Sequence, residues 1–158
     1  MCRSNCSRRA RSPYAKGEVW KTPTECEALL RRITEEIWNG RQLDLVDELI
    51  ADDFVDHIDM PSLAGTGRDR YRASVQLMHT AFSDYHEEIE LVVADDERAV
   101  SYVRLTGTHD GELMGLPPTG RAVNVHAMGI LRFADGQAVE RWGIGDNLTQ
   151  MQQLGLMG

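Results

Sequence analysis

The sequence contains no apolar run that approaches the ~20 residues needed to cross a membrane, although hydrophobic residues make up 42% of its 158 residues. Cysteine is also scarce: Cys2, Cys6 and Cys26 are the only three. No spacing of cysteine and histidine matches a zinc site. We therefore expect one globular domain with no membrane span and no bound metal, with reduced thiols of the kind found in the cytoplasm.

Basic residues are scarce outside the N-terminus. Residues 1–21 hold six of the 17 lysines and arginines, whereas residues 22–158 combine 11 basic with 24 acidic side chains. Because phosphate contacts dominate affinity for nucleic acids, this acidic body argues against nucleic-acid binding. The segment 1–21 lacks an apolar core of the secretory type and reads as a disordered basic tail. A targeting peptide or a nucleic-acid-binding arm are the alternatives for this segment, and 22–158 is the predicted folded domain.

Hydrophobic spacing predicts four helices. In the first, Thr22 is the expected N-cap and Pro23 the first helical residue, and the helix ends at Asn39-Gly40. In the last, Leu148, Met151 and Leu154 form the expected apolar stripe. The expected ranges are 24–39, 43–50, 68–82 and 146–154.

Alternating apolar residues and turn signals predict the strands. Asp135-Gly136, between two alternating runs, is a strong hairpin signal, and the segment 115–120 is a second turn rich in glycine and proline. The chain shows no strand–helix–strand alternation, which disfavours a parallel sheet. The sequence therefore predicts an α+β fold, in which helices close the concave face of a bent antiparallel sheet and enclose a pocket. The expected strands are 52–58, 87–93, 99–108, 122–133 and 137–144.

Four motifs, in this order, resemble those of the SnoaL-like polyketide (ester) cyclases. They are DDFVDH at 52–57, GTHDGELMGLPPTGR at 107–121, ILRFADG at 130–136, and a last segment that joins Arg141-Trp142 to QQLG at 152–155. The resemblance covers about residues 24–156. It implies a cone of the nuclear-transport-factor-like kind, usually a homodimer, whose cofactor-free pocket closes rings in aromatic polyketides by aldol chemistry.

The same resemblance locates the family's catalytic positions. The general acid/base of the family, an aspartate on the last strand, falls on Gly143, and a pocket histidine falls on Gly129. Both positions are glycine in this chain, and some similar proteins act as hydroxylases. Three functions therefore stay open: an enzyme of the cyclase group acting on a hydrophobic polyketide-like molecule, an auxiliary hydroxylase on the same substrate class, and a non-catalytic ligand-binding domain.

With glycine at these two positions, we expect a roomier pocket and a base from its rim. His57 is the first candidate, because Asp56 beside it can orient its ring and an unperturbed pKa of ~6.5 suits proton transfer near neutral pH. A polar rim is the alternative for this pair. Asp146 is the second candidate, and an N-cap of the terminal helix is its alternative.

Several further residues are candidates for binding the substrate. Arg104 and Arg141 have the charge to orient an anionic enolate, or else to pair with the surplus acidic residues. His126 shares a strand with Gly129 but points to the other face. There it would contact a partner subunit or have a structural role. His109 and Asp110 precede a turn. The expected substrate-binding residues are Trp38, Met78, Arg104, Met114, Gly129, Arg141 and Gly143. The second face carries Asn124, Met128 and Ile130 and is expected to pair with a second copy.

Overall fold

One sheet of five strands forms the frame of the protein, with the strand order β1-β5-β4-β3-β2. The structure, a computed structural model, describes residues 24–60 and 63–157, so the basic segment 1–21 lies outside the described residues. The elements are α1 (Glu25–Arg32), the π-helix η1 (Ile33–Asn39), the 3-10 helix η2 (Leu43–Leu45), α2 (Val46–Leu49), β1 (Ile50–Asp56), α3 (Gly67–Ala81), β2 (His86–Ala94), β3 (Arg98–Thr108), β4 (Ala122–Ala134), β5 (Gln137–Gly145) and α4 (Asn147–Gln153).

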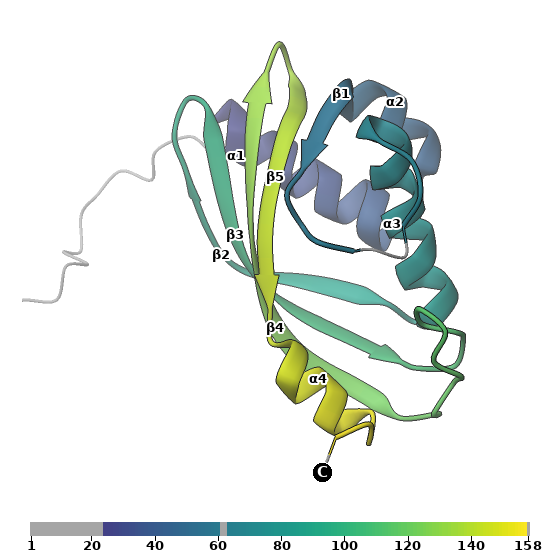
Figure 1. Ribbon diagram of the computed structural model, residues 1–158. Helices are drawn as coiled ribbons and strands as arrows, with labels where there is room; N and C mark the ends of the chain where they lie inside the picture. The colour runs from purple at the N-terminus through teal and green to yellow at the C-terminus, as the bar shows by residue number, and fades with distance from the viewer. Residues whose placement is uncertain (1–23, 61–62, 158) are drawn as a thin grey trace, which may run out of the picture.

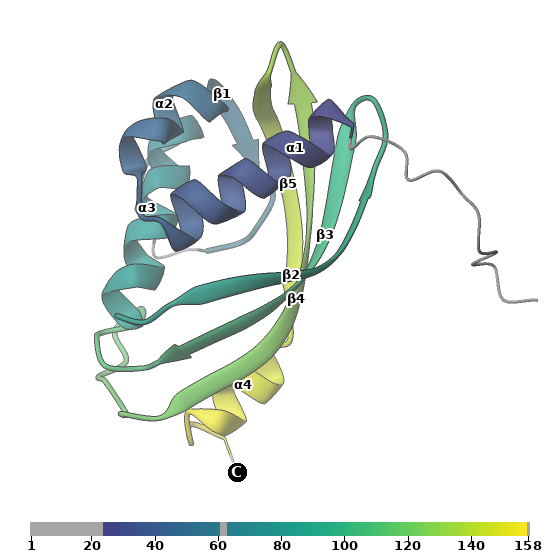
Figure 2. The same cartoon turned by 180° about the vertical axis from the view of Figure 1, so that it is seen from behind.

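The sheet is strongly bent, and its concave side is covered by helices. Strands β2 to β5 pair antiparallel, and β1 joins the edge of β5 in parallel orientation. Figure 1 shows α3 and the α1–η1 rod on the same side of this curved sheet, and Figure 2 shows α1 lying across the strands from behind. The predicted α+β cone with a bent antiparallel sheet is confirmed. The parallel pairing of β1 with β5 is an addition to it.

Alternation along the strands gives the sheet an inner and an outer face. In β4, Val123, Val125 and Leu131 are buried on the inner face, whereas Met128 is 42% exposed on the outer face. The β4–β5 turn has positive φ at both Asp135 (50°) and Gly136 (77°). These are the signs of φ that a two-residue hairpin with the right twist requires, so the predicted hairpin is confirmed.

The first helix begins and ends at residues with specific contacts. Thr24, and not Thr22 as expected, is the N-cap, because its side chain accepts a hydrogen bond from the Glu27 backbone N–H at 3.1 Å. The helix then widens into the π-helix η1. At Gly40 a Cβ would lie 2.6 Å from the Glu36 carbonyl oxygen, so only glycine fits the turn that ends η1, where the sequence predicted the end.

Two other helices differ from the expectation. The segment 43–50 holds only one 3-10 turn and the single turn of α2, because Ile50 already starts β1. In α4, Leu154 is buried (1% exposed) but Leu148 is 57% exposed, so the expected three-residue stripe is wrong at Leu148.

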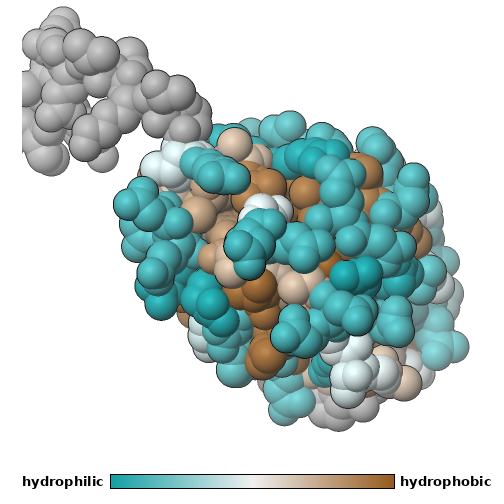
Figure 3. Space-filling view, turned by 90° about the horizontal axis from the view of Figure 1, so that it is seen from above, coloured by the Kyte–Doolittle hydropathy of each residue, from teal (hydrophilic) through white to brown (hydrophobic). Residues whose placement is uncertain are grey.

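The surface is mainly polar. Seen from above, hydrophilic side chains predominate and hydrophobic ones are exposed between them (Figure 3). Within the described residues no helix is long and apolar enough to cross a membrane.

Candidate active site

A buried ion pair joins the last strand to the first. Asp56 and Arg141 are partners in the parallel pairing of β1 with β5. Arg141 Nε donates to Asp56 Oδ1 at 3.1 Å, Nη2 donates to Oδ2, and the two side chains are only 9% and 2% exposed. The Ile58 backbone N–H also donates to Oδ1, at 3.1 Å. Because desolvation cancels most of the attraction in a buried pair, such pairs add little net stability, and this one marks a candidate functional position.

Aromatic rings surround the guanidinium of Arg141. Its Cζ lies 4.8 Å from the ring centre of Tyr71 and 5.9 Å from that of Trp38. The Trp38 indole N–H donates to the Tyr71 hydroxyl at 2.8 Å, and the two rings meet edge to face. A cation over an aromatic ring is attracted by the negative face of the ring. The rings therefore fix the position of a positive charge inside an otherwise apolar interior.

A carboxyl group on β2 faces the same interior. The Tyr85 hydroxyl donates to Glu87 Oε1 at 2.6 Å. Burial raises the pKa of Glu87 from 4.5 to about 7, while the Tyr85 hydrogen bond and the Arg141 charge act in the opposite direction. Burial also raises the pKa of Tyr71 and of Tyr85, so both hydroxyls stay protonated at neutral pH. Glu87 thus exchanges its proton in the range in which a general base works.

The end of the π-helix holds this carboxyl group in place. The Asn39 side chain accepts from the Glu87 backbone N–H at 2.8 Å and donates to the Glu87 carbonyl at 2.9 Å, as a neighbouring strand would. His79 on α3 donates through Nε2 to the Trp38 carbonyl at 2.6 Å, and its ring meets Tyr85 edge to face. These contacts tie η1, α3 and β2 together around one set of side chains. We call this set the inner cluster: Trp38, Asp56, Tyr71, Tyr85, Glu87 and Arg141.

Gly129 and Gly143 face the interior, directly opposite each other on β4 and β5. At Gly143 a Cβ would lie 2.8 Å from Ile58 Cδ1, whereas at Gly129 the nearest atom would be Ser101 Oγ at 3.6 Å. The extra room expected at Gly143 is therefore taken by Ile58, which follows β1, whereas a Cβ at Gly129 would make ordinary van der Waals contacts. A carboxyl group at Gly143 would require Ile58 to move.

His57 lies on the outer face. Consecutive residues of a strand point to opposite faces, so Asp56 turns inward to Arg141 and His57 turns outward. The His57 ring stacks on Trp142 (4.8 Å between centres), and its Nε2 lies 2.8 Å from Glu140 Oε1. The expected contact between Asp56 and His57 is absent, because the strand separates them.

Asp146 occupies the N-cap of α4. It accepts from the Thr149 backbone N–H at 3.0 Å and from the Thr149 hydroxyl at 2.7 Å. These two bonds hold the pKa of Asp146 below its usual range. Of the two alternatives for Asp146, the cap describes its geometry.

Arg104 and His126 belong to the outer face. Arg104 pairs with Glu88 and lies 3.3 Å from Glu90, and His126 stacks on Tyr102 and lies 3.3 Å from the same Glu90. Of the two roles predicted for Arg104, the structure therefore shows pairing with the surplus acidic residues.

The remaining candidates have no hydrogen bond or ion pair with the inner cluster among the described residues. Met78 packs against the core, and Met114 is 51% exposed in the loop between β3 and β4. His109 is fully buried and accepts the Thr119 backbone N–H at Nδ1 (3.2 Å). Asp110 accepts the Ser83 backbone N–H at 2.9 Å. Both hold the base of this loop, which is the expected turn role.

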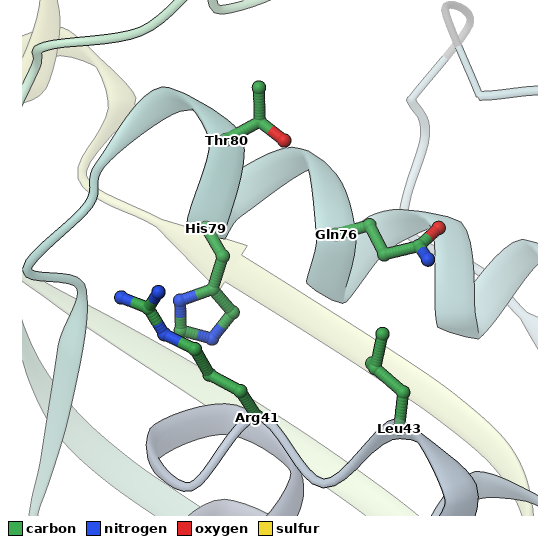
Figure 4. A pocket seen from close by; sticks show the side chains of 5 residues that line it. All are labelled: Arg41, Leu43, Gln76, His79 and Thr80. Atoms are coloured by element: carbon green, nitrogen blue, oxygen red, sulfur yellow. The ribbon is translucent and has the colours of Figure 1, made fainter.

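Two hollows run along α3. One of about 450 Å³ is lined by Arg41, Leu43, Gln76, His79 and Thr80, and Figure 4 shows Arg41 beside the imidazole of His79. The other, of about 600 Å³, includes Leu63, Leu77 and Met114. His79 reaches from the first hollow to the inner cluster through Trp38 and Tyr85. Among the described residues no group of three or more His, Cys, Asp or Glu side chains is arranged to hold a metal ion.

Comparison with known proteins identifies the family. Residues 28–154 match the family described as SnoaL-like polyketide cyclase. The chain belongs to this family. The nogalonic acid methyl ester cyclase of Streptomyces nogalater is 27% identical over 119 residues, 75% of this chain and 89% of that protein. The aklanonic acid methyl ester cyclase DnrD of Streptomyces peucetius is 30% identical over 135 residues, 80% of this chain and 88% of that protein.

A solved structure agrees with the fold. AclR of Streptomyces galilaeus, to which a hydroxylase activity is attributed, superimposes with a TM-score of 0.73 at 27% identity, over 85% of this chain and 98% of AclR. The SnoaL-like chain is thus similar both to methyl ester cyclases and to a protein with a different attributed activity.

Four residues of the site were missed from the sequence. Asn39, Tyr71, Tyr85 and Glu87 had no assigned role in it, because the contacts that bring them together join η1, α3 and β2 and do not follow from local pattern. A signal was present for Glu87: it shares a strand face with Ile89, whereas Glu88 shares the opposite face with Glu90.

Proposed function

We propose that this protein is a cofactor-independent enzyme of the cyclase type that closes a ring in a hydrophobic, aromatic polyketide-like molecule. The observation that carries the proposal is the inner cluster. It combines a guanidinium group, a carboxyl group with a pKa near 7 and three aromatic side chains on the concave side of a SnoaL-like cone. The names of the two curated relatives, both methyl ester cyclases, support the same substrate class.

An aldol ring closure needs what this cluster offers. A base removes a proton from the carbon next to a carbonyl group, and a fixed positive charge stabilises the enolate that forms. Arg141 lies in a buried, aromatic surrounding, where a charge acts more strongly than in water. The rings of Trp38, Tyr71 and Tyr85 are buried and keep water away from this charge.

A hydroxylase acting on the same class of molecule is the second candidate. The observation that favours it is Gly143, which leaves β5 without a carboxyl group on its inner face, together with the similarity to AclR. A ligand-binding domain without catalysis is the third.

One experiment separates the three. The purified protein is incubated with nogalonic acid methyl ester and with aklanonic acid methyl ester, and the products are followed by liquid chromatography and mass spectrometry. Ring closure by aldol addition gives a new peak of unchanged mass, hydroxylation adds one oxygen atom, and binding alone leaves the compound unchanged. A new peak of unchanged mass is the expected result, and unchanged compound despite measurable binding would contradict the proposal.

The outer face supports a second part of the proposal, a homodimer. Large apolar side chains are exposed there: Leu91 (58%) and Val93 (62%) on β2, and the opposed pair Met128 (42%) and Ile144 (76%) on β4 and β5. The pairings of β2 with β3 and of β4 with β5 put them on one side of the sheet. Because water-exposed apolar patches of this kind usually find a partner, a second copy of the chain is the expected one.

A further inference from the structure

We infer that Glu87, held by Tyr85 and Asn39, is the group that removes and returns the proton in the ring closure. The inference rests on the proposed function. It concerns a residue on β2, which is far in sequence from the last strand, β5. On β5, Gly143 supplies no carboxyl group.

The inner cluster contains two carboxyl groups, and they are bound differently. Asp56 is held by two hydrogen bonds from Arg141 and one from the Ile58 backbone N–H, so its charge is paired and three of its about four acceptor positions are occupied. Glu87 receives one bond, from the neutral Tyr85 hydroxyl. Among the described residues nothing donates to Glu87 Oε2, and this atom is not one of the fully buried unpaired polar atoms. Of the two carboxyl groups, Glu87 is therefore the one with an oxygen atom that is neither paired nor fully buried.

The position of Glu87 is fixed without use of its carboxyl group. Asn39 binds the backbone on both sides of the residue, at 2.8 and 2.9 Å, and Tyr85 orients one oxygen. A base must be held within hydrogen-bond reach of the proton that it removes. The free Oε2 then projects from a rigid support, which is the arrangement that such a role requires.

Glu87 alone accounts for both proton transfers of the ring closure. The carboxylate takes the proton from the carbon next to a carbonyl group, and the electrons of that C–H bond form the enolate. The enolate carbon bonds to the second carbonyl carbon, whose C=O π electrons become an alkoxide. The alkoxide takes the proton from the Glu87 carboxylic acid and becomes the hydroxyl of the product. Glu87 returns to the carboxylate, and nothing is oxidised or reduced.

The first test compares Glu87→Gln with Glu88→Gln. Glu88 is the adjacent residue, but it faces outward and pairs with Arg104, so it is the matched control. For wild type and both variants, ring closure and deuterium uptake at the activated carbon of the same methyl ester substrates are measured, with the dissociation constant from fluorescence. E87Q should lose ~10²–10⁴-fold in both rates while its dissociation constant stays within about threefold, and E88Q should match wild type.

The second test uses pH. Wild-type kcat/KM should fall as the pH drops below about 7, because protonated Glu87 is no base. Tyr85→Phe removes a bond that holds this pKa down, so the acidic limb should move to higher pH. A Tyr85 that only filled space would leave the limb where it is, and that result would contradict the assignment. Glu87→Asp, which keeps a carboxyl group, should retain more activity than E87Q and also serves if E87Q folds poorly.

The outcomes separate the inference from the proposed function. An active wild type together with an E87Q variant within fivefold of it overturns the role of Glu87 and leaves the proposed function standing. A wild type that binds the ester but neither closes the ring nor takes up deuterium overturns both.

Discussion

At the scale of single residues, the inner cluster separates two carboxyl groups by their surroundings. Asp56 is paired with a guanidinium group, whereas Glu87 has only a neutral hydroxyl partner in a partly buried position. Burial without a full ionic partner favours the protonated form. Two carboxyl groups in such different surroundings are typical of sites where one group carries charge and the other transfers protons.

The raised pKa of Glu87 predicts a cost in stability. An acid whose pKa is higher in the folded than in the unfolded state, here about 7 against 4.5, destabilises the fold increasingly between these two pH values and by a constant amount above them. E87Q should therefore be more stable than wild type at pH 8, by at most about 3 kcal/mol, and the difference should shrink toward pH 5. Urea unfolding at both pH values measures it. Equal stabilities of wild type and E87Q at pH 8 would show that the carboxyl is not destabilised by burial.

A second prediction concerns the buried ion pair. Arg141→Met leaves Asp56 charged, buried and without its main partner, which should lower the free energy of unfolding by about 3–5 kcal/mol. The double variant D56N/R141M should recover part of this loss, because no charge is left unpaired. Arg132→Met is the matched control: Arg132 pairs with Glu140 on the more exposed outer face, where such a pair contributes about 0–1 kcal/mol. Denaturant titration should show the largest loss in R141M, a smaller loss in D56N/R141M and the smallest in R132M. A loss in R141M no larger than in R132M would contradict the prediction.

At the scale of elements, the sequence predicted what depends on local pattern. The β4–β5 hairpin follows from alternation and from Asp135-Gly136, and the long helix α3 from its apolar spacing. The short helices were less predictable: the segment at 43–50 shows helical spacing, but pairing of Ile50 with Ala138 on β5 draws its last residue into the sheet. Tertiary contacts therefore override weak local preference in this segment.

The site depends on register, which the sequence alone does not give. Asp56 and Arg141 are 85 residues apart and meet only because β1 pairs with β5. A shift of this strand by one residue would turn His57 inward and Asp56 outward. The sequence predicted that Asp56 and His57 lie at a strand end near the pocket, but it could not show which of the two faces the inside of the sheet.

The π-helix supplies the third prediction. Wide helical turns of this kind often occur at functional sites, and η1 ends at Asn39, which binds Glu87 through two hydrogen bonds. Asn39→Ala should lower the free energy of unfolding by about 2 kcal/mol, since each bond contributes about 1 kcal/mol. Because the carboxyl group loses its support, kcat should fall more than KM rises. Asn147→Ala, at an exposed position on α4, is the control and should change neither. Unchanged kinetics in a folded N39A would show that Glu87 does not need this support.

At the scale of the whole molecule, the two faces of the sheet carry different kinds of side chains. The inner face, which the helices cover (Figures 1 and 2), carries the ion pair and Glu87, and η1 and α3 contribute Trp38 and Tyr71. The outer face carries stacked pairs, such as His57 on Trp142, next to exposed apolar side chains. Under the proposed function, residues of the outer face bear on assembly and those of the inner face on chemistry.

The last prediction tests the dimer on this outer face. Ile144 is 76% exposed on β5, beside Met128 of β4, and burial of such a side chain in an interface contributes through the hydrophobic effect. Ile144→Arg places a charge in the centre of the expected contact, where it would be desolvated without a partner. Sedimentation velocity at micromolar concentration should show a dimer for wild type and a monomer for I144R. Met114→Arg adds the same charge at another exposed residue, in the β3–β4 loop, and should leave the dimer intact. A wild type that sediments as a monomer, or an M114R variant that dissociates as I144R does, would rule out the outer face as the contact. Because Glu87 and Arg141 lie on the inner face, the I144R monomer should still bind the methyl ester substrate if the fold is unchanged.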